Sequence, residues 1–230
     1  MKKIAIVPVK HNSERVINKN FREFENGNSL FELKLNQLIS ENCYDQIYVS
    51  TNSPYVQKII DKSQFKSIKI IQRDNEYCSN DISWSEVIHH VVSSIPEKDE
   101  TCVSWCHTTS PLFNSYKECL DMFIDNYQSK RFNGLVTVSD FNEFLIDEKT
   151  NPINYSWGPW HKYSQYLTKY YTINGALFIA TKSEMLKNRY VISTNPYLYV
   201  TTKENSIDID DELDFKFAQF LISQKKHAEK

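Results

Sequence analysis

Glycine is scarce in this sequence, with four residues among 230. The Walker A loop and the dinucleotide fingerprint each need several glycines within a few residues, because a phosphate must approach the backbone closely. The polar loop from Lys10 to Asn20, which follows the first apolar run, contains no glycine. The sequence therefore excludes both kinds of nucleotide site in this loop.

Long apolar runs and an excess of one charge are absent as well. The first apolar run, residues 4–8, is too short for a secretory signal, and no stretch reaches the ~18 apolar residues of a membrane helix. The net charge is −2, from 27 basic and 29 acidic residues, whereas nucleic-acid-binding proteins are usually strongly basic. We therefore expect neither a membrane nor a nucleic acid as a partner.

The cysteines are few and odd in number, five in all. Cys102 and Cys106 are four residues apart, but no second Cys or His pair with zinc-type spacing follows them. A chain of this length buries an adequate core without cross-links. We expect free thiols, no structural zinc site and a cytoplasmic location.

The sequence does contain a regular alternation of short apolar strands and amphipathic helices over its first 140 residues. Strands are expected over residues 4–8, 46–50, 67–71, 101–106 and 135–139. Helices are expected over 30–39, with Ser29 as N-cap, after Pro54, over 83–94 and over 115–127. This order is typical of a parallel α/β sheet, in which functional residues gather at the carboxyl ends of the strands. We expect a single domain over residues 1–230.

The alternation is interrupted by residues 141–171, which are rich in aromatic side chains. We interpret this segment as an inserted extension that covers a substrate or packs against a second subunit, and packing is favoured because interfaces are enriched in Tyr and Trp. Strand character returns over residues 174–180 and 197–202, and a last helix is expected over 212–223.

The loop after the first strand carries three cations, Lys10, Arg15 and Lys19, among short polar side chains. Such a loop can grip a triphosphate through charge and hydrogen bonds. The alternative is a basic loop that merely faces solvent.

The segment Ile207-Asp208-Ile209-Asp210 places two carboxylates two residues apart. In extended backbone, alternate side chains share a face, so the aspartates point one way and the isoleucines face the core. Mg²⁺ prefers one or two carboxylates together with substrate phosphate oxygens. The alternative is that Asp210 or Asp211 caps the last helix.

Taken together, the loop, Thr109-Ser110-Pro111-Leu112, Asn174-Gly175-Ala176 and residues 206–210 resemble the acylneuraminate cytidylyltransferase family. These are the CMP-sialic, CMP-pseudaminic and CMP-legionaminic acid synthetases, and the motifs follow the family's order over nearly the whole chain. The resemblance implies an α/β fold of the Rossmann-like nucleotidyltransferase (GT-A-like) type, with a mixed sheet flanked by helices and a small dimerisation extension. It also implies a homodimer that uses CTP, a small acidic sugar and Mg²⁺ to make a CMP-sugar and pyrophosphate for surface glycan synthesis.

The resemblance implies roles for particular residues, and we add Arg15 to them on charge. We expect the following to bind CTP: Lys10, Asn12, Ser13, Lys19, Asn20, Arg73 and Ser83. We expect Lys10, Arg15, Lys19, Asp208 and Asp210 to act in catalysis, and the two aspartates to bind the metal. The acceptor is expected to contact His107, Thr109, Ser110, Gln165, Asn174 and Gly175.

Three positions depart from the family pattern. Glu14 stands where lysine is common, and His107 replaces a glutamine that contacts the sugar, although a histidine there can also serve the turn at 109–111. Ser164 stands where an arginine binds the sugar carboxylate, a contact worth roughly 1.5–3 kcal/mol. Substitutes for that arginine are His161, Lys162 and Lys169.

These departures leave other hypotheses open. The acceptor can instead be a phosphonate or a phosphorylated small molecule, or the chain can be a catalytically silent nucleotide-binding scaffold. Retention of both Asp208 and Asp210 argues against the silent scaffold.

Overall fold

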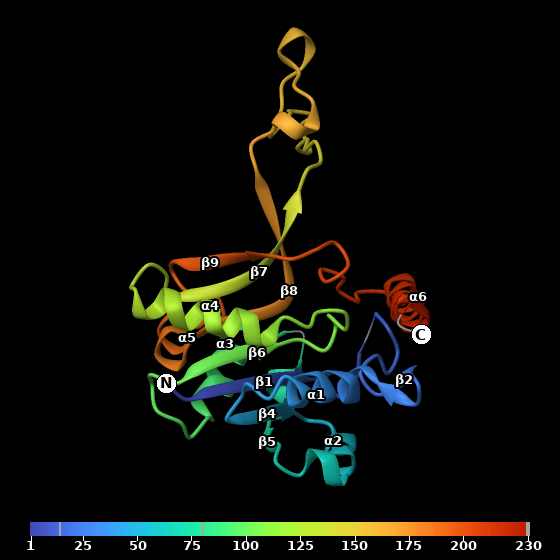
Figure 1. Ribbon diagram of the computed structural model, residues 1–230, viewed down its shortest axis with the longest axis vertical. Coiled ribbons are helices and arrows are strands. Elements are labelled where there is room, and N and C mark those ends of the chain that lie inside the picture. The colour runs from blue at the N-terminus through green and yellow to red at the C-terminus, as the bar shows by residue number, and fades with distance from the viewer. Residues whose placement is uncertain (14, 80, 229–230) are drawn as a thin grey trace.

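The computed structural model describes residues 1–13, 15–79 and 81–228. Its centre is a seven-stranded sheet in the order β5-β4-β1-β6-β8-β7-β9 (Figure 1). In this sheet β8 alone runs against its neighbours β6 and β7, and the other pairings are parallel. The strands are β1 Lys3–Val9, β4 Gln46–Thr51, β5 Lys69–Gln72, β6 Cys102–Cys106, β7 Gly134–Phe141, β8 Tyr170–Thr181 and β9 Pro196–Val200.

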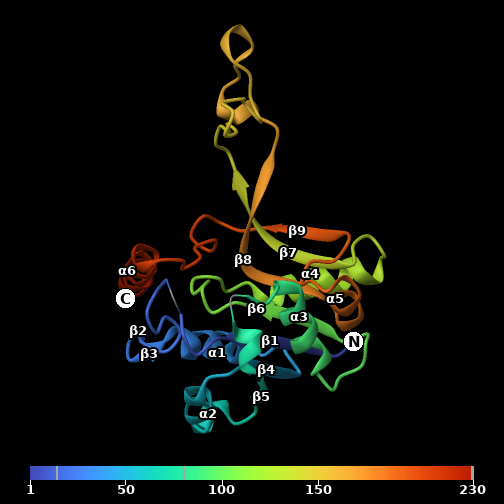
Figure 2. The same cartoon turned by 180° about the vertical axis from the view of Figure 1, so that it is seen from behind.

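Helices cover both faces of the sheet (Figures 1 and 2). Ala5, Val7 and Val9 of β1 pack in one core with α1, α2 and α4, whereas Ile4 and Ile6 pack in a second core with α3 and α5. Because successive strand residues point to opposite faces, a single apolar strand serves both cores. The helices are α1 Leu30–Ser40, α2 Pro54–Ile60, α3 Trp84–Ser93, α4 Tyr116–Gln128 and α5 Lys182–Asn188, with 3-10 turns at η1 Ser63–Phe65, η2 Asn75–Cys78, η3 Gly158–Trp160 and η4 Ser164–Tyr166.

The strands and helices expected from the sequence are present, with ends that differ by a few residues. Helix α1 begins as predicted: Ser29 is its N-cap, and Ser29 and Glu32 form a reciprocal capping box. The sequence did not indicate α5 or the small hairpin of β2 Glu23–Glu25 and β3 Asn28–Ser29. All five cysteines are free thiols, as expected.

The inserted segment forms an arm. Beyond the last pairing of β7 with β9, at Val138, β7 and β8 continue as a two-stranded ribbon that projects from the body (Figure 1). At its far end a small cluster of Phe144, Tyr155 and His161 holds the loops together. Several of the arm's aromatic side chains remain exposed, among them Trp157, Trp160, Tyr163 and Tyr166.

The last helix, α6 Glu212–Ala228, packs beside the first part of the chain. Phe215 joins Phe24, Leu30 and Ile209 in a third apolar cluster, and its ring meets that of Phe24 edge to face. Arg22 binds the Glu212 carboxylate through two hydrogen bonds of 2.8 Å. These contacts bring residues 207–210 against the loop that follows β1. None of the described helices is both long and apolar enough to cross a bilayer.

Candidate active site

A cavity of about 820 Å³ lies at the carboxyl ends of the four parallel strands on one side of the sheet. Each of these strands is followed directly by a residue that lines the cavity: Arg73 after β5, Asn52 after β4, Lys10 after β1 and His107 after β6. The cavity therefore lies where the α/β alternation predicted that functional residues would gather.

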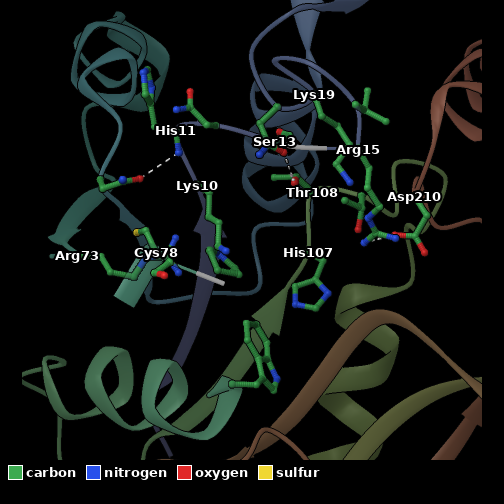
Figure 3. A pocket seen from close by; sticks show the side chains of 18 of the residues that line it. Lys10, His11, Ser13, Arg15, Lys19, Arg73, Cys78, His107, Thr108 and Asp210 are labelled. Atoms are coloured by element: carbon green, nitrogen blue, oxygen red, sulfur yellow. Dashed lines mark hydrogen bonds and ion pairs between the residues drawn. The ribbon is translucent and has the colours of Figure 1, made fainter. Parts of the chain in front are cut away.

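The loop after β1 closes over the carboxylate pair from one side of this cavity. The Arg15 guanidinium lies 2.8 Å from Asp210 Oδ1 (Figure 3). Lys19 Nζ donates a 2.6 Å hydrogen bond to the carbonyl of Ile209. Burial lowers the pKa of Lys19, while the charges of Asp208 and Asp210 oppose that shift. Lys10, Asn12, Ser13 and Asn20 line the same cavity. Glu14, expected to weaken the loop's charge, lies outside the described residues.

Residues 207–210 belong to no helix or strand of the described part of the chain. Ile209 is fully buried in the third apolar cluster, and its N–H donates to the carbonyl of Thr109 at 2.9 Å. This anchor leaves Asp208 and Asp210 on the cavity side, as the alternation of side chains predicted. Asp211 caps α6 instead, because its Oδ1 accepts from the backbone N–H groups of Leu213 and Asp214.

Asp208 has the features of a ligand for a hard cation. Its Oδ1 is buried and has no hydrogen-bond partner among the described residues. Burial raises the pKa of Asp208, and the charge of Asp210 adds to that shift, while a hydrogen bond from Thr109 opposes it. The described residues contain no group of three or more His, Cys, Asp or Glu side chains arranged for a metal ion. A pair of carboxylates open to substrate oxygens is a donor set that suits Mg²⁺.

The opposite end of the cavity is built around a buried cation. Arg73 is 2% exposed, and its guanidinium donates to the carbonyl of Val9 at 3.0 Å. Among the described residues its Nε has no hydrogen-bond partner, and Cys78 lies beside the guanidinium (Figure 3). Asn52 accepts from the backbone N–H of His11 and donates to Asn75, each at 3.0 Å.

Sequence reasoning missed several residues that line the cavity. They are His11, Asn52, Asn75, Cys78, Ser79, Trp84 and Thr108. Asn52 could have been predicted, because it lies two residues after the predicted strand 46–50 of the parallel sheet. Cys78 and Ser79 lie in a stretch without periodicity that offers no comparable signal.

His107 is held between two fixed partners. Its Nε2 accepts a 2.9 Å hydrogen bond from the indole of Trp105, and the ring also hydrogen-bonds the backbone of Gly175. Burial lowers the pKa of His107 to about 4, and the charge of Lys34 contributes. The imidazole is therefore neutral at pH 7 and is not free to act as a base. It bonds these two partners rather than the 109–111 turn that the sequence suggested.

Gly175 allows the backbone of β8 to lie close to His107 and Asp208. Its φ is +72°, and a Cβ at this position would lie 3.5 Å from His107 Nδ1 and 3.9 Å from Asp208 Oδ2. The backbone of β8 can therefore pass beside both side chains.

Of the remaining predicted residues, Thr109 lines the cavity and the others do not. Ser83 caps α3 by accepting from the N–H of Glu86, and Asn174 binds Ser139 and Thr201 within the sheet. The Ser110 carbonyl accepts from Lys34, whereas Thr109 borders the cavity. On the arm, at a distance from the body (Figure 1), lie Gln165, Ser164, His161, Lys162 and Lys169.

A Rossmann-like sheet with a basic loop and a carboxylate pair at the carboxyl ends of its strands defines a nucleotidyltransferase. Residues 4–155 match the cytidylyltransferase family model, and the chain belongs to that family. The family and the fold class predicted from the sequence are thereby confirmed.

Two curated relatives cover nearly the whole chain. It is 23% identical to a pseudaminic acid cytidylyltransferase of Campylobacter jejuni, over 96% of each protein. It is 24% identical to an N-acylneuraminate cytidylyltransferase of Escherichia coli, over 99% of this chain and 53% of the relative.

Solved structures share the fold at low identity. A CMP:2-keto-3-deoxy-manno-octonic acid synthetase complexed with CTP matches with a TM-score of 0.67 and 12% identity, over 98% of this chain and 100% of that one. The 2-C-methyl-D-erythritol 4-phosphate cytidylyltransferase of Francisella tularensis matches with a TM-score of 0.64 and 14% identity, over 96% and 99%.

Proposed function

We propose that this enzyme transfers CMP from CTP to a nonulosonic acid of the sialic, pseudaminic or legionaminic type and releases pyrophosphate. The observation that carries the proposal is one cavity in which Arg15 and Lys19 face Asp208 and Asp210. Relatives that align over nearly all of this chain bear the names of enzymes that act on pseudaminic acid and on N-acylneuraminate.

CTP would extend from the buried cation to the basic loop. The position of Arg73 supports a role near the base, since it is a buried donor at the cavity whose Nε has no hydrogen-bond partner among the described residues. Lys10, Arg15 and Lys19 would hold the triphosphate, with Asn12, Ser13 and Asn20 as polar contacts. Attack of an acceptor oxygen on the α-phosphorus needs positioning and charge neutralisation more than covalent chemistry, and these cations supply both.

Mg²⁺ is the cofactor that the carboxylate pair fits. Asp208 would hold it through its unpartnered Oδ1, and Asp210 would contribute a second carboxylate. When bound, the ion neutralises charge on phosphate oxygens and favours an ionised acceptor oxygen. Arg15 pairs with Asp210 in the free protein, and we infer that it exchanges this carboxylate for phosphate when nucleotide binds.

We further propose that the arm mediates a homodimer and completes the acceptor site. Trp160 is 76% exposed and Tyr163 is 72% exposed, and such large aromatic rings favour a protein interface. The cations that can replace the arginine missing at Ser164 lie on the same arm. Free thiols support a cytoplasmic setting, and the product would serve surface glycan synthesis.

The deciding experiment measures pyrophosphate release from CTP with Mg²⁺, with and without EDTA. The acceptor panel contains sialic, pseudaminic and legionaminic acids together with several phosphonates. We expect EDTA-sensitive release with at least one of the sugars. Release with a phosphonate alone would transfer the assignment to that acceptor class, and silence together with retained CTP binding would favour a nucleotide-binding scaffold.

A further inference from the structure

Lys34 of helix α1 is a fully buried cation that the reaction as proposed does not use. Its side chain is 1% exposed, and it belongs to none of the ion pairs among the described residues. Its Nζ donates to the carbonyl of Ser110 at 2.9 Å and to the hydroxyl of Tyr116, whose ring it also faces. A buried lysine without a carboxylate partner is rare, because burial disfavours its charge.

The acceptor of this lysine belongs to the turn that supports the candidate site. On the inner side, Lys34 binds the Ser110 carbonyl and Gln37 binds the Pro111 carbonyl at 2.6 Å. On the cavity side, the Thr108 hydroxyl donates to Asn20 Oδ1 at 2.7 Å. The carbonyl of Thr109 accepts from the N–H of Ile209 at 2.9 Å. The 108–111 turn therefore connects helix α1 with the backbone of Ile209, which lies between the two aspartates.

The charge of Lys34 is also felt in the cavity. Burial lowers its own pKa to about 8, and its charge is the second cause of the lowered pKa of His107, after burial. A cation that is shielded from water acts through a low local dielectric and resists screening by salt. Lys34 therefore places a buried positive charge behind the 108–111 turn, on the far side of that turn from a cavity that holds two carboxylates.

We propose that Lys34 is a positioning residue for nucleotidyl transfer: it fixes the 108–111 turn, which sets the place of Asp208 and Asp210, and adds positive potential behind the phosphates. The inference rests on the proposed function for its catalytic consequence, but its structural part is a property of the protein alone.

The test compares Lys34→Met with Lys182→Met. Lys182 serves as the control because it is also a buried lysine, 9% exposed, whose Nζ donates to two backbone carbonyls at 2.8 and 2.9 Å. It follows Thr181, which pairs with Cys102 at the amino end of β6, whereas the cavity lies at the carboxyl end of that strand. Both substitutions remove a buried cation and its hydrogen bonds, so a general loss of stability affects both variants.

Two quantities are measured in each variant: hydrogen exchange of the Ile209 amide by NMR in the free protein, and the Mg²⁺ concentration that gives half-maximal pyrophosphate release. We expect Lys34→Met to accelerate the exchange of the Ile209 amide. It should also raise the half-maximal Mg²⁺ concentration by about tenfold, which corresponds to the loss of about one hydrogen bond. Lys182→Met should match the wild type in both.

Equal effects in the two variants, or no effect in Lys34→Met, would overturn the inference. Should Lys34→Met fail to fold, Tyr116→Phe removes one acceptor of Lys34 and leaves its charge, and unchanged Ile209 exchange there would also overturn it. If the wild type releases no pyrophosphate with any acceptor, the proposed function fails while the exchange measurement still decides the role of Lys34.

Discussion

At the scale of single residues, Asp208 is a buried carboxylate that lowers the stability of the fold at neutral pH. Burial raises the pKa of this carboxyl group, and its Oδ1 has no hydrogen-bond partner among the described residues. An acid whose pKa is higher in the folded than in the unfolded state destabilises the fold increasingly as pH rises through that interval, and fully above it. The strain is relieved when an acidic solution protonates the group, or when a cation binds it.

Asp208→Asn should therefore separate activity from stability. We expect turnover to fall by at least about 100-fold, as when one electrostatic group is removed from an active site. The melting temperature at pH 7 should rise, by roughly 2–4 °C for each kcal/mol in a chain of this size. Calorimetry and pyrophosphate release measure the two effects, and the gain in melting temperature should vanish at acidic pH.

Asp210→Ala, at a more exposed carboxylate, should lose turnover with little change in stability. Normal turnover in either variant would contradict the metal assignment.

His107 predicts an acid limit to stability. Because its pKa is lowered to about 4, an unfolded chain binds a proton at this position between pH 6.5 and 4 that the folded protein refuses. The stabilisation from neutral His107 is thus present above pH 6.5 and is lost as pH falls toward 4. The melting temperature of His107→Gln should decline less over this window than that of the wild type. Parallel decline in both proteins would show that the imidazole titrates normally.

At the scale of elements, helix α6 holds the carboxylate segment in place. Phe215 is 3% exposed and packs on Phe24, with the Arg22 guanidinium 3.7 Å from the centre of its ring. Ile209, which precedes the helix, belongs to the same apolar cluster. The stability of this helix is therefore coupled to the geometry of the cavity.

Phe215→Ala should lower the free energy of unfolding by about 3–5 kcal/mol, the range for removing a buried aromatic ring. It should also raise the Mg²⁺ requirement, because the 207–210 segment loses its anchor. Phe217→Ala is the matched control, since that ring is 51% exposed on the same helix, and a surface change costs less than about 0.5 kcal/mol. Urea denaturation of both variants measures the difference, and equal losses would show that the helix packs through its other face.

Elements also show where sequence reasoning succeeds and where it ends. Periodicity and the carboxyl-end rule sufficed for the αβ alternation, the loop after β1 and the alternating aspartates, because these depend on neighbours along the chain. The antiparallel insertion of β8 depends on pairings between distant strands. Ser83 illustrates a local ambiguity, since a serine before a helix is both a good N-cap and a good ligand. The lowered pKa of His107 depends on its burial and on the charge of Lys34, and both arise only in the folded state.

At the scale of the whole molecule, the arm divides the surface into a compact body and a projecting aromatic ribbon (Figure 2). In the ribbon, β7 and β8 pair only with each other beyond Val138. Substitutions in the arm should therefore leave the stability of the body nearly unchanged.

Trp160→Ser combined with Tyr163→Ser should convert a dimer to a monomer without unfolding the body. Light scattering coupled to size exclusion gives the mass, and circular dichroism checks the fold. Leu213→Ser, on the exposed face of α6 (74% exposed), serves as a control for loss of exposed apolar surface elsewhere. A dimer that survives the double substitution would place the interface off the arm.

The joining of the loop after β1 to the 207–210 segment has a consequence for synthesis. Lys19 meets Ile209 and Arg22 meets Glu212 across 190 residues in each case, whereas β1, β4 and β5 pair early in the chain. Proteins emerge from the ribosome amino end first, at ~5–20 residues per second, so the parallel half of the sheet is complete well before the aspartates exist. A nascent chain halted before Asp208 would hold the parallel strands and the loop after β1 but would lack the two aspartates that line the cavity. The cavity therefore gains its complete lining only after residues 207–210 have been synthesised and α6 has packed against the third apolar cluster.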